Sequence, residues 1–226
     1  WMLVARDAFN GKVLWKRAIN KWHSHLWPLK SGPTQLARRL VAHKDRVYVT
    51  LGIDAPLTAL DAATGKTVHA YKDTAGTEEI IFSNGNLYLL VNKGKSALSK
   101  FAPQNNVGDQ ARVRKEFLWN QQPRLLMGFN ADSGIRYWKK ETKVAPLTLS
   151  ANAKQVFFYD GEKVDCVDGM TGEAVWKSVP VARRPNVTFN FGPKLVIYND
   201  IVLFAGGDRK MRALAVKDGK QLWEAP

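Results

Sequence analysis

Few residues of the 226-residue sequence have the types and spacing of a catalytic or metal site. His23 and His25 stand two positions apart in WHSHLW and could point the same way on an extended segment, as metal ligands do. No third ligand lies near them in the sequence, so an ordinary loop is favoured. Cys166 is the single cysteine, which excludes an internal disulfide and a cysteine-rich metal site. We predict neither catalytic residues nor metal ligands.

The formal net charge of +14 comes mostly from two segments. Residues 16–40 contain six Lys or Arg and no acid, and residues 92–124 contain seven basic and two acidic residues. Such a charge indicates an anionic partner or surface, although it is also compatible with simple solubility. No apolar stretch approaches the roughly 18 residues that a membrane-spanning helix needs.

An eleven-residue pattern recurs five times, at residues 5–15, 59–69, 128–138, 166–176 and 213–223. In most copies an Asp or Asn at the third position can open a turn and accept backbone amides. A glycine at the seventh position allows the positive φ of a tight hairpin. The aromatic ring four residues later is predicted to dock on the glycine of a neighbouring repeat. The glycine and ring positions are Gly11 and Trp15, Gly65 and His69, Gly134 and Trp138, Gly172 and Trp176, and Gly219 and Trp223.

Two short strand patterns precede each later copy, so each repeat is predicted to be four antiparallel strands with the motif across the last hairpin. Asn84-Gly85 is a strong hairpin signal of this kind. Four-stranded sheets repeated in this way are the blades of an all-β propeller. The predicted ranges are a half blade at 1–17 and blades at 36–72, 78–140 with an insertion at 92–124, 146–178 and 193–226.

The pattern A-x-D-x-x-T-G-x-x-x-W resembles the tryptophan-docking motif of the PQQ-like (pyrrolo-quinoline quinone) β-propeller repeats, as in quinoprotein dehydrogenases and outer-membrane assembly lipoproteins of the BamB type. His69, Asn130, Ala215 and Asp218 depart from it, which suggests looser docking in the second and fifth copies. The resemblance implies a ring of seven or eight blades, of which about four and a half are present, and open blade faces that pair with further blades or another copy. It also implies a periplasmic or cell-envelope location.

Strand parity places the connections between blades and the 92–124 insertion on one face, where basic and aromatic residues can bind a polyanion. An alternative stays open, in which the aromatics anchor long loops and the lysines are merely solvated. The candidate partner-binding residues are Lys21, Trp22, His23, His25, Trp27, Arg38, Arg39, Arg112, Arg114, Lys115, Trp119, Arg183 and Arg184.

Two functions remain in competition. The first is a non-catalytic propeller module that binds a protein or a polyanionic partner, with nucleic acid as a less favoured case. The second is a fragment of a PQQ-dependent alcohol or sugar dehydrogenase that holds PQQ and calcium. Enzymes of that family commonly carry adjacent paired cysteines beside the cofactor, which this sequence lacks. Asp54, Glu162 and Asp208 are the carboxylates nearest the predicted face, and they form no recognisable ligand cluster. We therefore predict no cofactor.

Overall fold

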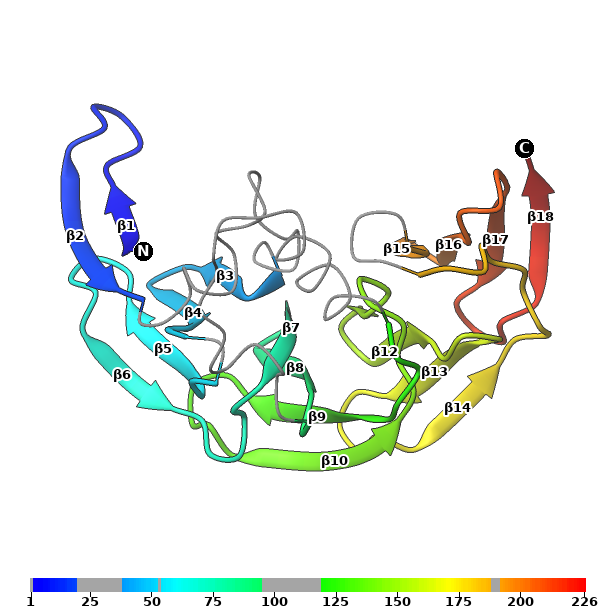
Figure 1. Ribbon diagram of the computed structural model, residues 1–226, viewed down its shortest axis with the longest axis horizontal. Helices are drawn as coiled ribbons and strands as arrows, with labels where there is room; N and C mark the ends of the chain where they lie inside the picture. The colour runs from blue at the N-terminus through cyan, green and yellow to red at the C-terminus, as the bar shows by residue number, and fades with distance from the viewer. Residues whose placement is uncertain (1, 20–37, 53, 95–118, 188–191) are drawn as a thin grey trace, which may run out of the picture. The chain divides into compact units, whose positions relative to one another are not determined.

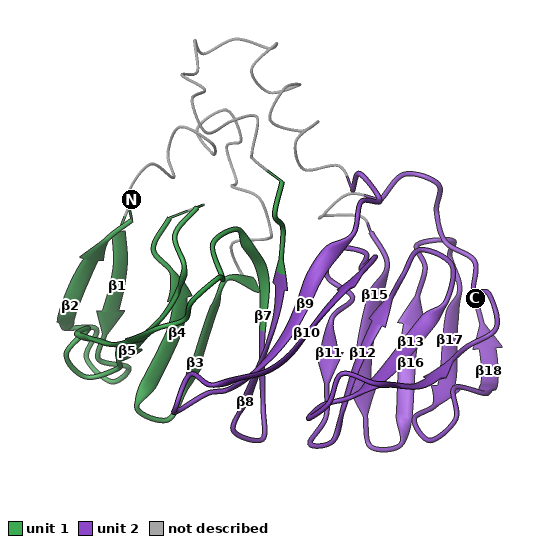
Figure 2. Cartoon of the chain, turned by 90° about the horizontal axis from the view of Figure 1, so that it is seen from below, with its two compact units in different colours: residues 1–80, 91–116 green, residues 81–90, 117–226 purple. Residues whose placement is uncertain are grey.

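The computed structural model describes residues 2–19, 38–52, 54–94, 119–187 and 192–226. The chain divides into two compact units, one of residues 1–80 and 91–116 and the other of residues 81–90 and 117–226 (Figure 2). The described residues form 18 strands and no α-helix (Figure 1).

The strands form five sheets in chain order, one of two strands and four of four strands (Figure 1). The two-stranded sheet pairs β1 (Met2–Arg6) with β2 (Val13–Ala18). The next contains β3 (Leu40–His43), β4 (Arg46–Thr50), β5 (Leu57–Asp61) and β6 (Thr67–Ala70). The third contains β7 (Thr77–Ser83), β8 (Asn86–Val91), β9 (Arg124–Asn130) and β10 (Arg136–Thr142).

The last two sheets belong to the second unit. One contains β11 (Ser150–Ala151), β12 (Gln155–Tyr159), β13 (Val164–Asp168) and β14 (Ala174–Lys177). The other contains β15 (Lys194–Tyr198), β16 (Ile201–Ala205), β17 (Met211–Ala215) and β18 (Gln221–Ala225). Strands that are consecutive in sequence are neighbours in each sheet, which confirms the predicted all-β architecture of propeller blades.

Strand β12 shows why these sheets are apolar on both faces. Successive side chains of a strand point to opposite faces. Val156 and Phe158 lie in one buried cluster with residues of β8, β9 and β10, whereas Phe157 and Tyr159 lie in another with residues of β15, β16 and β17. A strand that is buried on both faces has no solvent-exposed positions, so polar residues do not alternate with apolar ones along it. This explains why the sequence QVFFY of β12 is almost continuously hydrophobic.

The repeated hairpins share one backbone design. Their glycines have φ between +69° and +72°, and the strand pairing slips by one residue beside each of them. In the fourth copy Asp168 Oδ1 accepts the amides of Met170 and Thr171, each at 2.8 Å. Asn130 caps the third copy in the same way. In the fifth, where Ala215 replaces the acid, Asp218 Oδ1 accepts the amide of Lys220 at 3.1 Å.

Three tryptophan rings each lie directly on a glycine of the next repeat. Trp15 lies on Gly65, Trp138 on Gly172 and Trp176 on Gly219. An ideal Cβ placed on Gly65 would be 2.5 Å from Cδ2 of Trp15, and one on Gly172 would be 2.6 Å from Cδ2 of Trp138. Trp176 covers Gly219 in the same manner. Only a residue without a side chain leaves room for these rings.

A hydrogen bond fixes the orientation of each docked ring. The indole nitrogen donates to the carbonyl oxygen of the residue three positions before the glycine. The pairs are Trp15 with Ala62 at 2.8 Å, Trp138 with Gly169 at 2.9 Å and Trp176 with Val216 at 2.7 Å. We call the glycine together with that carbonyl the seat. His69 instead lies edge-on to Tyr71 of its own repeat, with the ring centroids 4.8 Å apart.

Replacing Asp168 by Asn tests the charged cap of the fourth hairpin. The hydrogen bond from the Thr171 amide is the main cause that lowers the pKa of Asp168 in the folded chain. The charge therefore adds stability above the unfolded pKa of about 3.9, and this contribution is lost as the pH falls through the lower folded pKa. We expect Asp168→Asn to be less stable than the parent at neutral pH by about 1 kcal/mol or less. Urea unfolding should show the gap closing below about pH 4, and a gap that is constant with pH would contradict the prediction.

Replacing Gly172 by Ala tests the docking of Trp138. The new Cβ would meet the ring, and alanine is also strained at a φ of +72°. We expect a loss of about 2–4 kcal/mol in the free energy of unfolding. Gly85→Ala is the matched control, because Gly85 has a φ of +77° and no heavy atom within 4 Å of an added Cβ. It should lose only about 1–2 kcal/mol. Equal losses in the two variants would show that ring contact adds nothing.

Candidate partner-binding site

Five of the residues predicted for the partner-binding face lie in the described part of the chain. They are Arg38, Arg39, Trp119, Arg183 and Arg184. The other predicted residues lie outside the described residues: Lys21, Trp22, His23, His25, Trp27, Arg112, Arg114 and Lys115. Most of the two basic segments lies outside them as well, so the predicted face stays a prediction.

Trp119 anchors a connection in the second unit. Its side chain is buried in the cluster that contains Phe157 and Phe204, and its amide donates to the carbonyl of Val187 at 3.2 Å. Its ring also covers Gly161, where an added Cβ would lie 2.6 Å from the ring. A buried ring offers no surface for stacking on a partner, so Trp119 fits the interpretation in which aromatics anchor long loops.

Arg183 holds the same connection in place. Its guanidinium carbon lies 5.7 Å from the centroid of the Trp119 ring, a distance typical of a cation–π contact. Its Nε donates to the carbonyl of Gly161 at 2.9 Å, and Nη1 donates to the carbonyls of Arg184 and Pro185. Three carbonyl partners fix this side chain, so Arg183 serves the loop structure. Arg184 is half-buried, and its amide donates to the carbonyl of Gly206.

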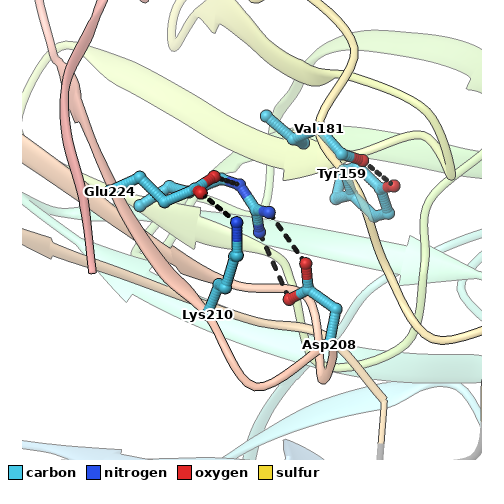
Figure 3. Close-up of polar contacts among 6 residues, drawn as sticks. Tyr159, Val181, Asp208, Lys210 and Glu224 are labelled. Carbon is cyan, nitrogen blue, oxygen red and sulfur yellow. Dashed lines mark hydrogen bonds and ion pairs between the residues drawn. The ribbon is translucent and has the colours of Figure 1, made fainter. Parts of the chain in front are cut away.

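Tyr159 lies beneath this connection. Its hydroxyl oxygen is 2.9 Å from the carbonyl oxygens of both Gly161 and Val181, and the Val181 contact is drawn in Figure 3. Burial raises the pKa of Tyr159 to about 12. The phenol therefore stays protonated at neutral pH, as a hydrogen-bond donor to a carbonyl must.

Arg38 and Arg39 lie just before β3 in the first unit. The side chain of Arg38 is 3.8 Å from the carboxylate of Glu79, which is fully buried. Arg39 is buried, and its burial lowers the pKa of the guanidinium although the charges of Glu78 and Asp54 oppose the shift. Asp54, one of the carboxylates closest to the predicted face, thus acts electrostatically on a buried arginine.

Asp208 is held in a closed network of charges just before β17 (Figure 3). Its two carboxylate oxygens accept Nη1 and Nη2 of Arg212 at 3.2 and 2.7 Å. The Nε of Arg212 lies 2.8 Å from Glu224, which also accepts Lys210 at 2.5 Å. Arg212 lowers the pKa of Asp208, so this carboxylate is a poor general base at neutral pH. This network was not predicted from the sequence, because Arg212 meets Glu224 only through the pairing of β17 with β18.

Cys166 is fully buried in β13, opposite Trp176 of β14. Burial is the largest cause that raises the pKa of its thiol to about 12, with the nearby Asp165 and Asp168 adding to the effect. The thiolate that a nucleophile or a metal ligand requires is therefore disfavoured.

The neighbouring Asp165 pairs with Lys177 across the same two strands at 2.7 Å. This second charge pair was not predicted from the sequence.

The described carboxylates do not form a ligand cluster of the kind that calcium needs. Calcium needs six to eight oxygen ligands, usually with several carboxylates. Within the described ranges no group of three or more His, Cys, Asp or Glu is arranged to hold a metal ion. Asp168 and Asp61 cap turns, and Asp208 pairs with Arg212. The same ranges contain no helix with the length and hydropathy of a membrane span.

Comparisons with solved structures show the fold that these sheets share. BamB from Moraxella catarrhalis is 15% identical, with a TM-score of 0.55 over 99% of this chain and 58% of that chain. Quinohemoprotein alcohol dehydrogenase from Comamonas testosteroni is 15% identical, with a TM-score of 0.60 over 99% of this chain and 40% of that chain. A quinohemoprotein alcohol dehydrogenase from Pseudomonas putida is 14% identical, with a TM-score of 0.51 over 82% of this chain and 33% of that chain. The chain thus spans less than two thirds of each.

Comparison with curated protein sequences gives no significant match. The family model described as outer membrane protein assembly factor BamB matches residues 2–177 and 114–226. The two matches cover all but the first residue, and they agree with the docking motif and the four-stranded sheets described above. The chain therefore belongs to the PQQ-like β-propeller family that includes BamB.

Proposed function

We propose that this chain is a non-catalytic propeller module that binds an acidic protein segment through its basic segments, residues 16–40 and 92–124. The observation that carries the proposal is that described carboxylates are paired with arginines, whereas the basic segments have few acids to pair with. Two carboxylates of the described residues are paired with arginines, Asp208 with Arg212 and Glu79 with Arg38. The basic segments carry most of a net charge of +14 with few acids of their own.

Membership in the BamB family supports a role in assembly, because the family description names an assembly factor of outer membrane proteins. By the same family relationship we assign the chain to the cell envelope. A protein partner fits both points, since complementary charge steers association and selects partners. Other polyanions, including nucleic acid, also carry negative charge, but membership in the family does not support them as partners.

Charge reversal in the basic segments tests the proposal. We expect the combined change of Lys21, Arg112, Arg114 and Lys115 to Glu to weaken the binding of a fluorescent poly-glutamate peptide by at least about tenfold. The dependence of affinity on salt should also become less steep, because fewer opposite charges remain to be screened. Fluorescence anisotropy at several salt concentrations measures both effects.

The matched control reverses four exposed lysines in hairpin turns, where strand parity predicts the opposite face: Lys12, Lys66, Lys154 and Lys217. This variant has the same net charge as the first and should retain most of the affinity. Equal weakening in both variants would reduce the effect to net charge and contradict a defined binding face. If the chain binds single-stranded DNA more strongly than poly-glutamate, its partner is a nucleic acid and not a protein. Dye-linked alcohol oxidation after addition of PQQ and calcium would overturn the non-catalytic assignment.

A further inference from the structure

Met170 lies in the turn of the fourth repeated hairpin, among backbone groups that are fixed by hydrogen bonds. The carbonyl of Gly169 accepts the indole of Trp138 at 2.9 Å, and the amide of Gly169 donates to the carbonyl of Lys154 at 2.7 Å. The amide of Met170 itself donates to Asp168 Oδ1 at 2.8 Å. These bonds fix the backbone that carries the side chain, and 51% of Met170 is exposed.

The sulfur of Met170 contacts a buried amide group that belongs to an earlier strand. Nδ2 of Asn86, the first residue of β8, donates to Sδ of Met170 across 3.9 Å, and Asn86 is only 7% exposed. Both residues lie in the second compact unit. A thioether is a weak acceptor, so the sulfur satisfies this buried donor poorly. A stronger acceptor at the same place would therefore stabilise the contact.

The hairpin itself does not require methionine at this position. Asp168 caps the turn and Gly172 supplies the positive φ, whichever side chain lies between them. The same position of the motif holds other residues in the other four copies: Phe9, Ala63, Asp132 and Lys217. The thioether is therefore a feature of this one contact and not of the repeat.

Oxidation converts the weak acceptor into a strong one. Hydrogen peroxide transfers one oxygen atom to a methionine sulfur, which loses two electrons, while the O–O bond breaks and the peroxide leaves as water. The product is a sulfoxide, whose oxygen is polar and accepts hydrogen bonds. Because the sulfur of Met170 lies 3.9 Å from Nδ2 of Asn86, an oxygen bonded to this sulfur can come within hydrogen-bond distance of the amide.

We propose that Met170 is a reversible oxidation site for peroxides, and that Asn86 binds the sulfoxide oxygen and so strengthens the contact between β8 and the fourth hairpin. The usual result of methionine oxidation is the opposite, because a polar oxygen disrupts an apolar core. Here the side chain is half-exposed and its partner is a buried donor. The inference goes beyond the proposed function, since it involves neither the basic segments nor their partner.

Mass spectrometry after treatment of the folded chain with hydrogen peroxide tests the oxidation step. Met2 and Met211 are also exposed, so both are replaced by Leu in a background variant that is used throughout. Met127 of β9 is fully buried and serves as the internal standard. The peptide with Met170 should gain one oxygen at least about tenfold faster than the peptide with Met127, since oxidation follows exposure. Equal rates would overturn the proposed site.

Urea unfolding before and after oxidation tests the role of the sulfoxide. Oxidation should raise the folding equilibrium constant by about threefold, because a buried amide gains a stronger hydrogen bond. Methionine sulfoxide reductases should then remove the oxygen and return the unfolding curve to its starting position. A folding equilibrium constant that falls on oxidation, or a gain that persists after the mass has returned, would contradict the proposal.

Substitutions of the two partners are the matched controls. Asn86→Ala removes the donor, so oxidation of this variant should bring no gain. Met170→Leu cannot be oxidised, and peroxide should leave its stability unchanged. Met170→Gln carries an amide oxygen close to the position of the sulfoxide oxygen. Without any oxidant, its folding equilibrium constant should exceed that of Met170→Leu by about threefold.

Two results with these variants would overturn the inference. They are a gain on oxidation that survives in Asn86→Ala, and a Met170→Gln variant that is no more stable than Met170→Leu. If Asn86→Ala does not fold, the comparison at position 170 still decides, because both substitutions there replace a half-exposed side chain.

Discussion

The contact between a tryptophan ring and a bare glycine peptide links three pairs of successive sheets in the described part of the chain. Glycine is required at each seat for two reasons. The hairpin needs a φ near +70°, and the ring needs the space that a Cβ would fill. The indole hydrogen bond to the carbonyl three residues earlier then fixes the direction of the ring. A single substitution at a seat therefore disturbs the turn and the packing between sheets together.

The repeat made the fold predictable, because each element recurs at a fixed offset from the glycine. The caps of Asp7, Asp61 and Asp168 follow from local hydrogen bonding within a turn, and Asn130 keeps the oxygen that this cap needs. Where the offset pattern fails, the local contacts differ. His69 packs on Tyr71 of its own repeat. In the fifth copy Ala215 has no carboxylate, and Asp218 Oδ1 accepts the amide of Lys220, the contact that Thr171 makes with the amide of Glu173 in the fourth copy.

The candidate site was less predictable because it lies in connections of irregular length. The burial of Trp119 beside Arg183 depends on residues distant in sequence, and no period signals it. The same holds for Arg39, a charged residue in a basic segment whose side chain is nonetheless buried. Strand parity and the basic and aromatic composition of the connections assigned all of these to one surface. The charge pairs of Asp208 with Arg212 and of Asp165 with Lys177 depend on how strands and turns are paired, and they emerge only when the register is known.

Each docking contact is divided between two repeats, since one supplies the ring and the next supplies the glycine and its carbonyl. Duplication of a repeat that carries both the tryptophan and the glycine would therefore add one ring and one matching receptor. Stability in such an array depends on nearest neighbours. A family built in this way can change its number of repeats in whole steps without redesigning any junction, which leaves the connecting loops free to diverge toward different partners.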